Sequence, residues 1–593
     1  MNKKVKAYWN KSWPEETPKS IDYDELSMGK LLERTAKKYP NSEAIYFEGW
    51  ECSYEELNDL VDKFATGLSE LGIKKGDVVA IDLPNVPQYV IAHFAVLKLG
   101  AISNPILPVN RYVEITHQIR NSNAKMLIIL DHLYEEYLHE KDLSKMESLE
   151  TVILTELSDY LPKFKGFLGK VFNKIPYMKE WPNKVGKIHF RAFKKVLKKR
   201  NKRNVPKVKI NIREDPAVLI YTGGTTGVPK GVVTTHYNLI VNAQQANMWA
   251  DTQLVEMKET KGKGGMLLVV PLAHSYGNIG MSVAILEGWK LVLLPRPPEP
   301  ISDILKTCAK HKITYLPGVP TLYHKLNEDP ASKKYKGKLD SLLACICAAS
   351  PLSKEVKDNF ENITDASIVE GYGMSECSPI ISLNPFKNTK IKTVGLPLPD
   401  TEIKVVDFED RLKMLPACPR ETCKDCGIST EQKYVGEICV SGPQVMKGYL
   451  NNPEATEYAL ETDSEGKKWL FTTDVGCIRA RDGYLRLKDR KRDMIKYKGH
   501  SVFPREVEAL MLMHEAIEEV GVIGVPHEDA GENIKAYITL KQGYDGYITA
   551  EDIKEWCKEN ISAYKYPRLV EIAPELPKNV IGKILKRELR QMT

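Results

Sequence analysis

Residues 221–231 read Tyr-Thr-Gly-Gly-Thr-Thr-Gly-Val-Pro-Lys-Gly, directly after an apolar run at 216–220 that predicts a buried strand. Glycine lets the backbone approach an anion closely, consecutive N–H groups form an anion-binding nest, and the threonine hydroxyls and Lys230 add donors and charge. The stretch is not a Walker A loop, because Pro229 precedes the lysine and Gly231 follows it. It is typical of a phosphate-binding loop behind a strand, with an ordinary Gly/Thr turn as the alternative.

The segments around this loop alternate helical and strand-like patterns. Apolar residues have helical spacing over 57–71, whereas 78–81 and 126–130 are continuous apolar runs. Such alternation favours an α/β fold with layered subdomains and a largely parallel sheet. Residues 401–490 are rich in strand patterns. We therefore predict a large N-terminal domain over 1–490, which ends in a small β region, and a small mobile α+β domain over 491–593.

The composition is that of a soluble globular protein, with 42% hydrophobic and 27% charged residues in a chain of 593. The basic start lacks a following apolar run, so no signal peptide is expected. Residues 266–295 are interrupted by prolines, glycines and charges, which indicates strand, loop, helix and strand rather than a membrane span. Eleven mostly scattered cysteines favour a reducing, cytoplasmic location.

One segment makes the protein basic. Residues 160–213 hold 18 Lys and Arg and a single acid, Glu180, while the rest of the chain is net acidic. Within it, apolar residues recur at three- and four-residue spacing over 161–175 with lysines between them, which is the pattern of a basic amphipathic helix at a membrane surface. We predict peripheral association with the inner membrane surface through 160–203. The alternative is a helix packed on its own domain with a solvated basic face. Nucleic-acid binding is not expected, because the aromatics lack a base-stacking arrangement.

The chain resembles the adenylate-forming enzymes, which comprise acyl-CoA synthetases, luciferases and peptide-synthetase adenylation domains. Residues 221–231 resemble their phosphate loop, and further segments follow in the family's order. These are Pro271-Leu-Ala-His-Ser-Tyr276, Cys347-Ala-Ala-Ser-Pro-Leu-Ser353, Glu370-Gly-Tyr-Gly-Met-Ser-Glu376, Thr472-Thr-Asp474 and Leu576-Pro-Lys-Asn-Val-Ile-Gly-Lys583. Two family glycines are alanines in 347–353, and Thr473 replaces a glycine, which leaves the backbone angles at Thr473 open.

The resemblance implies a nucleotide site for ATP and Mg²⁺. Tyr372 would stack on adenine, Asp474 and Arg490 would contact the ribose, and Glu376 and Thr225 would serve the metal. The residues implied to bind the nucleotide or coenzyme A are Thr222, Gly223, Gly224, Thr226, Gly227, Lys230, Ala349, Glu370, Gly371, Tyr372, Gly373, Met374, Ser375, Asp474, Arg490, Arg492 and Gly499. A further segment, 442–449, resembles a core motif that is largely structural.

The implied reaction needs no nucleophilic side chain, since a carboxylate attacks the α-phosphorus of ATP and pyrophosphate leaves. By resemblance, Lys583 neutralises charge at the reacting phosphate, and His274 and Thr225 complete the catalytic set. Arg492 matches the position about which the family's C-terminal domain rotates. Residues 497–500 match the loop that reaches the tunnel for the coenzyme A thiol.

Resemblance to the subgroup is closest to long-chain fatty acyl-CoA ligases. A medium-chain or aryl acid ligase and an adenylation domain that loads a carrier protein are the alternatives within the superfamily. A nonenzymatic nucleotide-binding or membrane-scaffold protein would have lost the catalytic lysine, whereas Lys583 is present. The sequence leaves the acyl chain length and a homodimer open.

A cysteine cluster lies outside these motifs. Cys418, Cys423 and Cys426 are spaced as in a metal clip, with Cys439 or Cys477 as the fourth ligand. Free thiols in a surface insertion are the alternative.

Overall fold

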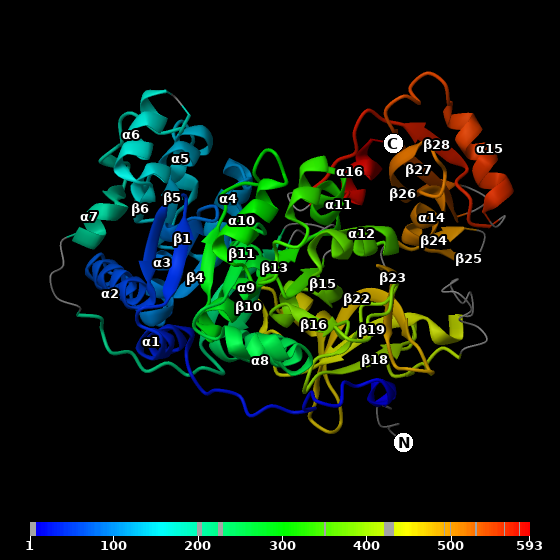
Figure 1. Cartoon of the computed structure of the whole chain (residues 1–593), viewed down its shortest axis with the longest axis horizontal. Helices are drawn as coiled ribbons and strands as arrows, with labels where there is room; N and C mark the ends of the chain where they lie inside the picture. Colours follow the sequence, from blue (N-terminus) through cyan, green and yellow to red (C-terminus); the bar gives the residue numbers. More distant parts are fainter. Residues whose placement is uncertain are drawn as a thin grey trace.

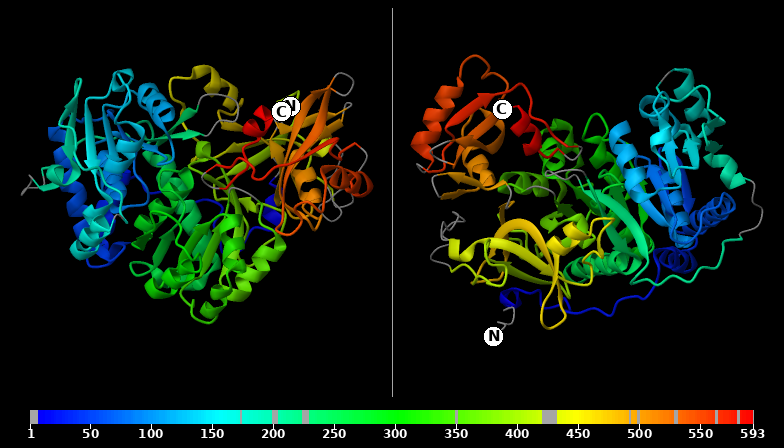
Figure 2. Two further views of the ribbon diagram at one scale, coloured as in Figure 1. Left: turned by 90° about the horizontal axis from the view of Figure 1, so that it is seen from above. Right: turned by 180° about the vertical axis from the view of Figure 1, so that it is seen from behind.

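The computed structural model describes residues 7–172, 174–198, 204–222, 229–348, 351–419, 432–490, 493–497, 500–527, 531–561, 564–579 and 582–592. Four sheets form within these residues (Figures 1 and 2). No helix among them is both long and apolar enough to cross a bilayer.

The first sheet is parallel in its centre and antiparallel at both edges. Its strands, in spatial order, are β17 (Leu396–Pro397), β16 (Ile380–Leu383), β15 (Ser367–Gly373), β14 (Ala344–Cys347), β13 (Tyr315–Gly318), β11 (Gly265–Leu268), β12 (Lys290–Leu293), β1 (Glu43–Phe47) and β2 (Trp50–Ser53). The central strands are almost wholly buried, because a parallel sheet is covered by helices on its faces.

The second sheet has the same plan, with a parallel centre and antiparallel edges. Its strands, in order, are β20 (Gly448–Tyr449), β10 (Lys230–Thr235), β9 (Pro216–Thr222), β4 (Ile102–Ile106), β3 (Val78–Asp82), β5 (Met126–Leu130), β6 (Thr151–Thr155), β8 (Ile188–Ala192) and β7 (Lys184–Val185). In this sheet β3 is paired with β4 on one side and with β5 on the other.

Two smaller sheets follow in the second half of the chain. One consists of β18 (Glu402–Val406), β19 (Gly436–Ser441), β22 (Lys468–Ile478) and β21 (Leu460–Thr462), with β23 (Leu485–Arg490) paired to β22. The other consists of β25 (His500–Val502), β24 (Ile495–Tyr497), β27 (Gly531–Leu540) and β26 (Ile517–His527), with β28 (Leu569–Ile572) paired to β27.

Helices connect and cover the sheets. They are α1 (Met28–Lys38), α2 (Tyr54–Glu70), α3 (Pro87–Lys98), α4 (Tyr112–Ser122), α5 (Asp131–Tyr137), α6 (Lys163–Val171), α7 (Phe193–Lys198), α8 (His236–Gln253), α9 (Ser275–Glu287), α10 (Asp303–His311), α11 (Pro320–Glu328), α12 (Lys354–Thr364), α13 (Pro453–Ala459), α14 (Pro504–Met511), α15 (Ala550–Asn560) and α16 (Lys586–Gln591). Every residue of α3 is buried, and α1, α2, α8 and α9 join it in the main core.

The predicted fold class is confirmed. The apolar runs at 78–81, 126–130 and 216–220 are strands, and 266–295 forms β11, α9 and β12 as expected. These patterns are informative because a parallel strand buried on both faces needs an uninterrupted apolar run.

The basic segment 160–213 is only partly a surface feature. Its strands β7 and β8 extend the edge of the second sheet, and Phe193 of α7 stacks on Phe64 with ring centroids 4.2 Å apart. Phe190, Val196 and Leu197 are buried as well. For residues after 188, therefore, the structure favours the alternative in which the segment packs on its own domain. Helix α6 differs, because its large apolar side chains are exposed.

Asp82 is an unusual residue at the end of β3. It is fully buried, and neither carboxylate oxygen has a hydrogen-bond partner among the described residues. Burial raises the pKa of the Asp82 carboxyl well above its ordinary value. The folded protein therefore holds this carboxyl in its neutral form at pH values where the unfolded chain ionises it.

Replacing Asp82 with asparagine is expected to stabilise the protein at pH 8 and to change little at pH 4. Below the unfolded-state pKa of about 4, both states carry the proton. As the pH rises, the unfolded chain releases the proton first, so the stability of the parent falls while that of the variant does not. A gain of about 1–3 kcal/mol at pH 8 is expected. Apparent melting temperatures at the two pH values measure it. The exposed Asp340→Asn is the control, and an equal shift at both pH values would contradict the argument.

Candidate active site

The predicted phosphate loop joins two antiparallel strands. Its residues 223–228, which include Gly223, Gly224, Thr225, Thr226 and Gly227, lie outside the described residues. The two ends are described: Thr222 of β9 and Lys230 of β10 are register partners, so the loop starts and ends at one point of the sheet. The two ends of the predicted loop are thus fixed at the end of a buried hairpin.

Lys230 links this hairpin, through Tyr449, to Glu376, the residue predicted to bind the metal. Its ammonium lies 5.0 Å from the ring centroid of Tyr449, on β20, which pairs with β10. The Tyr449 hydroxyl donates a hydrogen bond of 2.7 Å to Oε1 of the buried Glu376. Burial and the neighbouring Glu376 carboxylate raise the pKa of Tyr449. The hydroxyl therefore remains a donor, and the three side chains form a compact group of an ammonium, a phenol and a carboxylate.

Tyr449 was missed as a site residue, because the segment 442–449 was interpreted as largely structural. The signal that could have found it is a lone aromatic at the end of a glycine-containing motif. Only the pairing of Tyr449 with Val232, across more than 200 residues of chain, brings it beside Glu376.

The segment 370–376 runs along β15 and continues into a short turn. A side chain at Gly373 would place its Cβ 2.2 Å from the Pro379 carbonyl oxygen, and one at Gly371 would meet Leu383 at 2.5 Å. Position 373 therefore requires glycine, because its neighbour is backbone, whereas at Gly371 the Leu383 side chain would have to move. The Met374 N–H donates to Pro379 O at 2.9 Å, and Ser375 Oγ lies 3.2 Å from Ser275 Oγ of α9.

Glu370 is buried in this segment. Desolvation raises the pKa of its carboxyl to about 8, against the lowering effects of the Leu352 N–H and of Arg505 from α14. The carboxyl is consequently protonated in part at neutral pH.

Tyr372 and Asp474, the residues predicted to contact adenine and ribose, touch each other in the structure. The buried Tyr372 hydroxyl donates a 2.7 Å hydrogen bond to Asp474 Oδ2, although the two residues are 102 positions apart. Asp474 on β22 is the backbone register partner of Arg490 on β23. The Arg490 side chain lies outside the described part of the chain. An aromatic ring and a carboxylate acceptor are thus adjacent.

The backbone at Thr473 adopts φ = 59°, in the left-handed region that favours glycine. This answers the question that the sequence left open: the backbone has a conformation that favours glycine even though a β-branched residue occupies the position. The Thr473 N–H donates to the buried Glu437 Oε1 at 3.1 Å, and the Asp474 N–H donates to Thr472 Oγ1 at 3.1 Å. These contacts hold the strained residue in place.

Thr473→Gly is expected to raise the free energy of unfolding by up to about 1 kcal/mol, since relief of left-handed strain exceeds the entropy that glycine adds to the unfolded chain. Thr462→Gly, at an exposed strand position without positive φ, is the matched control and should destabilise. Denaturant unfolding compares the two. Destabilisation by both substitutions would show that Thr473 is not strained.

His274 caps α9 at its N-terminus. Its Nδ1 accepts a hydrogen bond of 3.1 Å from the Tyr276 N–H, so the neutral ring carries its proton on Nε2. Desolvation lowers the pKa of His274 to about 4. The Tyr276 hydroxyl donates to Ile346 O at 2.9 Å, which joins α9 to β14. His274 is therefore a neutral donor near the ends of the parallel strands.

We call the last sheet, β24 to β28, with helices α14 to α16 the C-terminal unit. Lys583 lies in a tight turn of this unit. Its N–H donates to Asn579 Oδ1 at 2.8 Å, and the Asn579 N–H donates to Lys583 O at 2.9 Å. Gly582 lies against the first turn of α11, where an added Cβ would be 3.3 Å from Thr321 Oγ1. Figure 1 shows this part of the C-terminal unit beside α11. The turn therefore lies against the start of α11, which follows β13.

Three further predicted residues, Ala349, Arg492 and Gly499, lie outside the described residues. So do Cys423 and Cys426 of the cysteine cluster. Cys418 is buried, and burial together with a hydrogen bond between the thiols raises the pKa of Cys477 well above its ordinary value. Cys439 instead bonds Glu437 O at 3.9 Å. No group of three metal-ligating side chains occurs among the described residues, and metal binding stays a prediction.

The sequence pattern of the AMP-binding enzyme family matches residues 32–450, and that of the AMP-binding enzyme C-terminal domain matches residues 506–583. The chain belongs to the AMP-binding enzyme family, and the predicted membership is confirmed.

Relatives match over nearly the whole chain. The long-chain-fatty-acid–CoA ligase of Bacillus subtilis (strain 168) is 34% identical over 98% of this chain and 97% of its own length. The ligase of the same name from Escherichia coli O157:H7 is 32% identical over 99% and 98%. A solved long-chain-fatty-acid-CoA ligase from Archaeoglobus fulgidus is 26% identical, with a TM-score of 0.64 over 94% and 98%. ATP-bound MatB from Rhodopseudomonas palustris, at 23% identity, shares the fold with a TM-score of 0.74 over 96% and 99%.

Proposed function

We propose that this protein activates a long-chain fatty acid with ATP and transfers the acyl group to coenzyme A, releasing AMP and pyrophosphate. Three contacts between predicted site segments support the proposal: Tyr372 with Asp474, Glu376 with Tyr449 and Lys230, and Gly582 of the Lys583 turn against α11. The full-length similarity to the Bacillus subtilis long-chain-fatty-acid–CoA ligase supports the choice of substrate and thiol.

The adenosine part of ATP would lie on the ring of Tyr372, beside the backbone of Gly371 and Gly373. Asp474 would accept hydrogen bonds from the ribose hydroxyls, with Arg490 as a second contact. The backbone of Glu370, Met374 and Ser375 would line the same side, together with Ala349. The loop from Thr222 to Lys230 would hold the β- and γ-phosphates.

The donor set fits a magnesium ion. Mg²⁺ is usually held by one or two carboxylates and the substrate phosphates, and Glu376 offers a buried carboxylate oriented by Tyr449. Thr225 would add a hydroxyl. When bound, the ion would screen the phosphate charges. Lys230 adds a fixed positive charge beside this group.

The two half-reactions would use different residues. In the first, the fatty acid carboxylate displaces pyrophosphate at the α-phosphorus. Lys583 would neutralise the charge that develops on the phosphate. The Nε2–H of His274 would donate a hydrogen bond to the fatty acid carboxylate. In the second, the coenzyme A thiol displaces AMP from the acyl carbon. Lys583 withdraws to admit the thiol, with Arg492 at the pivot and Gly499 in the loop that enters.

We also propose that the enzyme works at a membrane surface, where long-chain acids are found, and that residues 160–203 make the contact. The exposed apolar face of α6 supports this placement. A homodimer stays a prediction.

The proposal is tested by measuring AMP and pyrophosphate release with ATP, Mg²⁺ and coenzyme A across acids from acetate to oleate, with benzoate and coumarate added. Turnover that depends on coenzyme A and peaks at long chains is expected. A peak at short or aromatic acids would favour the medium-chain or aryl ligase instead, and no turnover with any acid would refute the ligase.

A further inference from the structure

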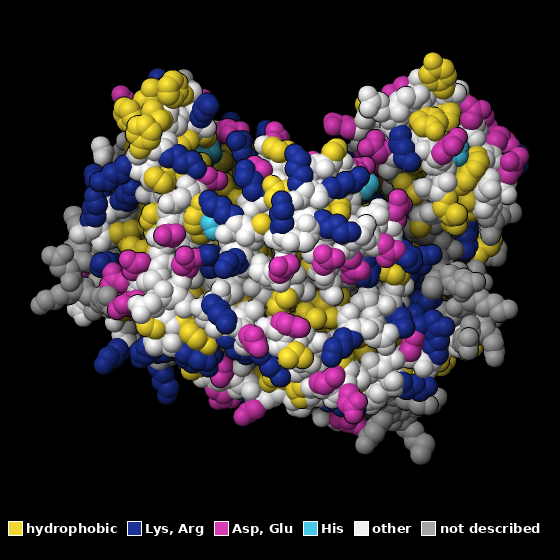
Figure 3. All heavy atoms as spheres, viewed as in Figure 1, with side chains coloured by type: hydrophobic (Ala, Val, Ile, Leu, Met, Phe, Trp, Pro, Cys, Tyr) yellow, Lys and Arg dark blue, Asp and Glu magenta, His cyan; other side chains and the backbone are white. Residues whose placement is uncertain are grey.

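Helix α6 turns its apolar residues away from the protein. Phe164, Phe167, Val171 and Phe172 are 76%, 66%, 57% and 66% exposed. They lie three, four and one residues apart, which places them on one side of the helix and its C-terminal turn. Large hydrophobic side chains gather in this way at the tip of the lobe at the upper left of Figure 3. A helix that merely packs on its own domain would bury this face.

Small residues form the inner side of α6. Gly166 is buried, and an added Cβ there would lie 3.5 Å from Ser158. At Gly169 an added Cβ would lie 2.2 Å from Ile175. The glycine side of the helix therefore lies against Ser158 and the returning chain at Ile175, whereas the phenylalanines are on the exposed side.

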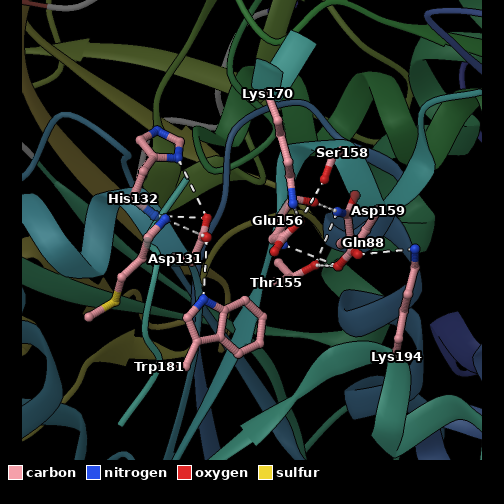
Figure 4. Close-up of polar contacts among 11 residues, drawn as sticks. Gln88, Asp131, His132, Thr155, Glu156, Ser158, Asp159, Lys170, Trp181 and Lys194 are labelled. Carbon is pink, nitrogen blue, oxygen red and sulfur yellow. Dashed lines mark hydrogen bonds and ion pairs between the residues drawn. The ribbon is translucent and has the colours of Figure 1, made fainter. Parts of the chain in front are cut away.

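Carboxylates of the domain hold α6 in this orientation. Lys165 is paired with Glu48, and Lys170 with Glu156 at the end of β6 (Figure 4). The chain that returns from the helix is anchored by the buried Asp131, which accepts hydrogen bonds from the Met178 N–H at 2.9 Å and the Trp181 indole N–H at 3.4 Å. The outward face is thus fixed by several independent contacts.

The surroundings of the apolar face are strongly basic. Lys163 and Lys174, next to the two ends of the exposed apolar run in the chain, are exposed, and the segment 160–213 carries 18 Lys and Arg against one acid. An apolar face with exposed cations at both ends of its helix fits a layer of anionic headgroups above acyl chains. A second copy of the same face would instead bring two basic segments together, at a cost in repulsion.

We infer that Phe164, Phe167, Val171 and Phe172 of α6 insert into an anionic lipid surface while the lysines around them contact the headgroups. The inference rests on the proposed function for its biological sense, because long-chain acids partition into bilayers. Its physical basis is separate, since no residue of α6 belongs to the candidate active site.

Sedimentation with vesicles tests the inference on the full-length protein. The vesicles are phosphatidylcholine alone or phosphatidylcholine with phosphatidylglycerol, at low and high salt. The test variant carries Phe164→Ser, Phe167→Ser and Phe172→Ser. The control is Met513→Ser, whose side chain is equally exposed, at 75%, on the C-terminal unit. All four substitutions lie at the surface, so the fold should be kept.

The parent and the control are expected to bind the anionic vesicles, less at high salt, and the triple variant at least about tenfold more weakly. Equal binding by parent and triple variant, or no binding by the parent, would overturn the inference. So would a parent dimer in ultracentrifugation that the triple variant breaks without any vesicle binding. Acyl-CoA synthesis from a detergent-dispersed acid should be unchanged in the triple variant. Its absence in all proteins would refute the proposed function while leaving the vesicle result to stand.

Discussion

Replacing Lys583 with alanine is expected to slow formation of the acyl-adenylate by about a hundredfold or more, because a charge held at the developing negative phosphate contributes a few kcal/mol to the barrier. The turn that carries Lys583 is built from main-chain bonds and from Asn579, so it should survive the loss of the side chain. Pyrophosphate release in a single turnover with fatty acid and ATP measures the first step.

The second step separates a catalytic role from a structural one. If Lys583 acts only before the thiol enters, the variant should convert supplied acyl-adenylate and coenzyme A to acyl-CoA at close to the parent rate. The control is Lys578→Ala, which removes a lysine five positions earlier that pairs with Glu519 at 2.5 Å. Equal losses in both half-reactions, or equal losses in both variants, would contradict the assignment.

The second large effect is expected for Glu376→Gln. The substitution keeps the size of the side chain and an oxygen that can accept the Tyr449 hydroxyl, but it removes the negative charge that suits Mg²⁺. We expect turnover to fall about a hundredfold at the Mg²⁺ concentration that saturates the parent, and more Mg²⁺ to restore part of it. A titration of pyrophosphate release with Mg²⁺ at fixed ATP measures this.

Tyr449→Phe is the graded comparison for this experiment. It removes the hydroxyl that orients Glu376 while leaving the carboxylate, and it keeps the ring beside Lys230. A loss of a few fold is expected, with a small change in the Mg²⁺ requirement. An unchanged Mg²⁺ dependence in Glu376→Gln would show that the metal is held elsewhere.

Much of the fold was predictable because its signals are local. The strand at 216–220 and the helix over 57–71 follow from apolar runs and helical spacing, and the Gly/Thr loop follows directly after its strand. Such patterns record which side of an element is apolar, and a run of a few residues is enough to show them. The family motifs were recognisable for a similar reason, since each is a short run of residues.

The tertiary structure alone decided the contacts between those runs. The hydrogen bond from Tyr372 to Asp474 and that from Tyr449 to Glu376 join positions 102 and 73 residues apart, through sheet registers that no local pattern specifies. The orientation of α6 is a further case. Its amphipathic pattern was visible in the sequence, but a periodic pattern cannot say which side of the helix faces the protein. In the structure the glycine side faces the protein and the phenylalanine side is exposed. Sequence therefore determined the elements and the chemistry they carry, whereas packing across long separations determined which side chains meet and which remain exposed.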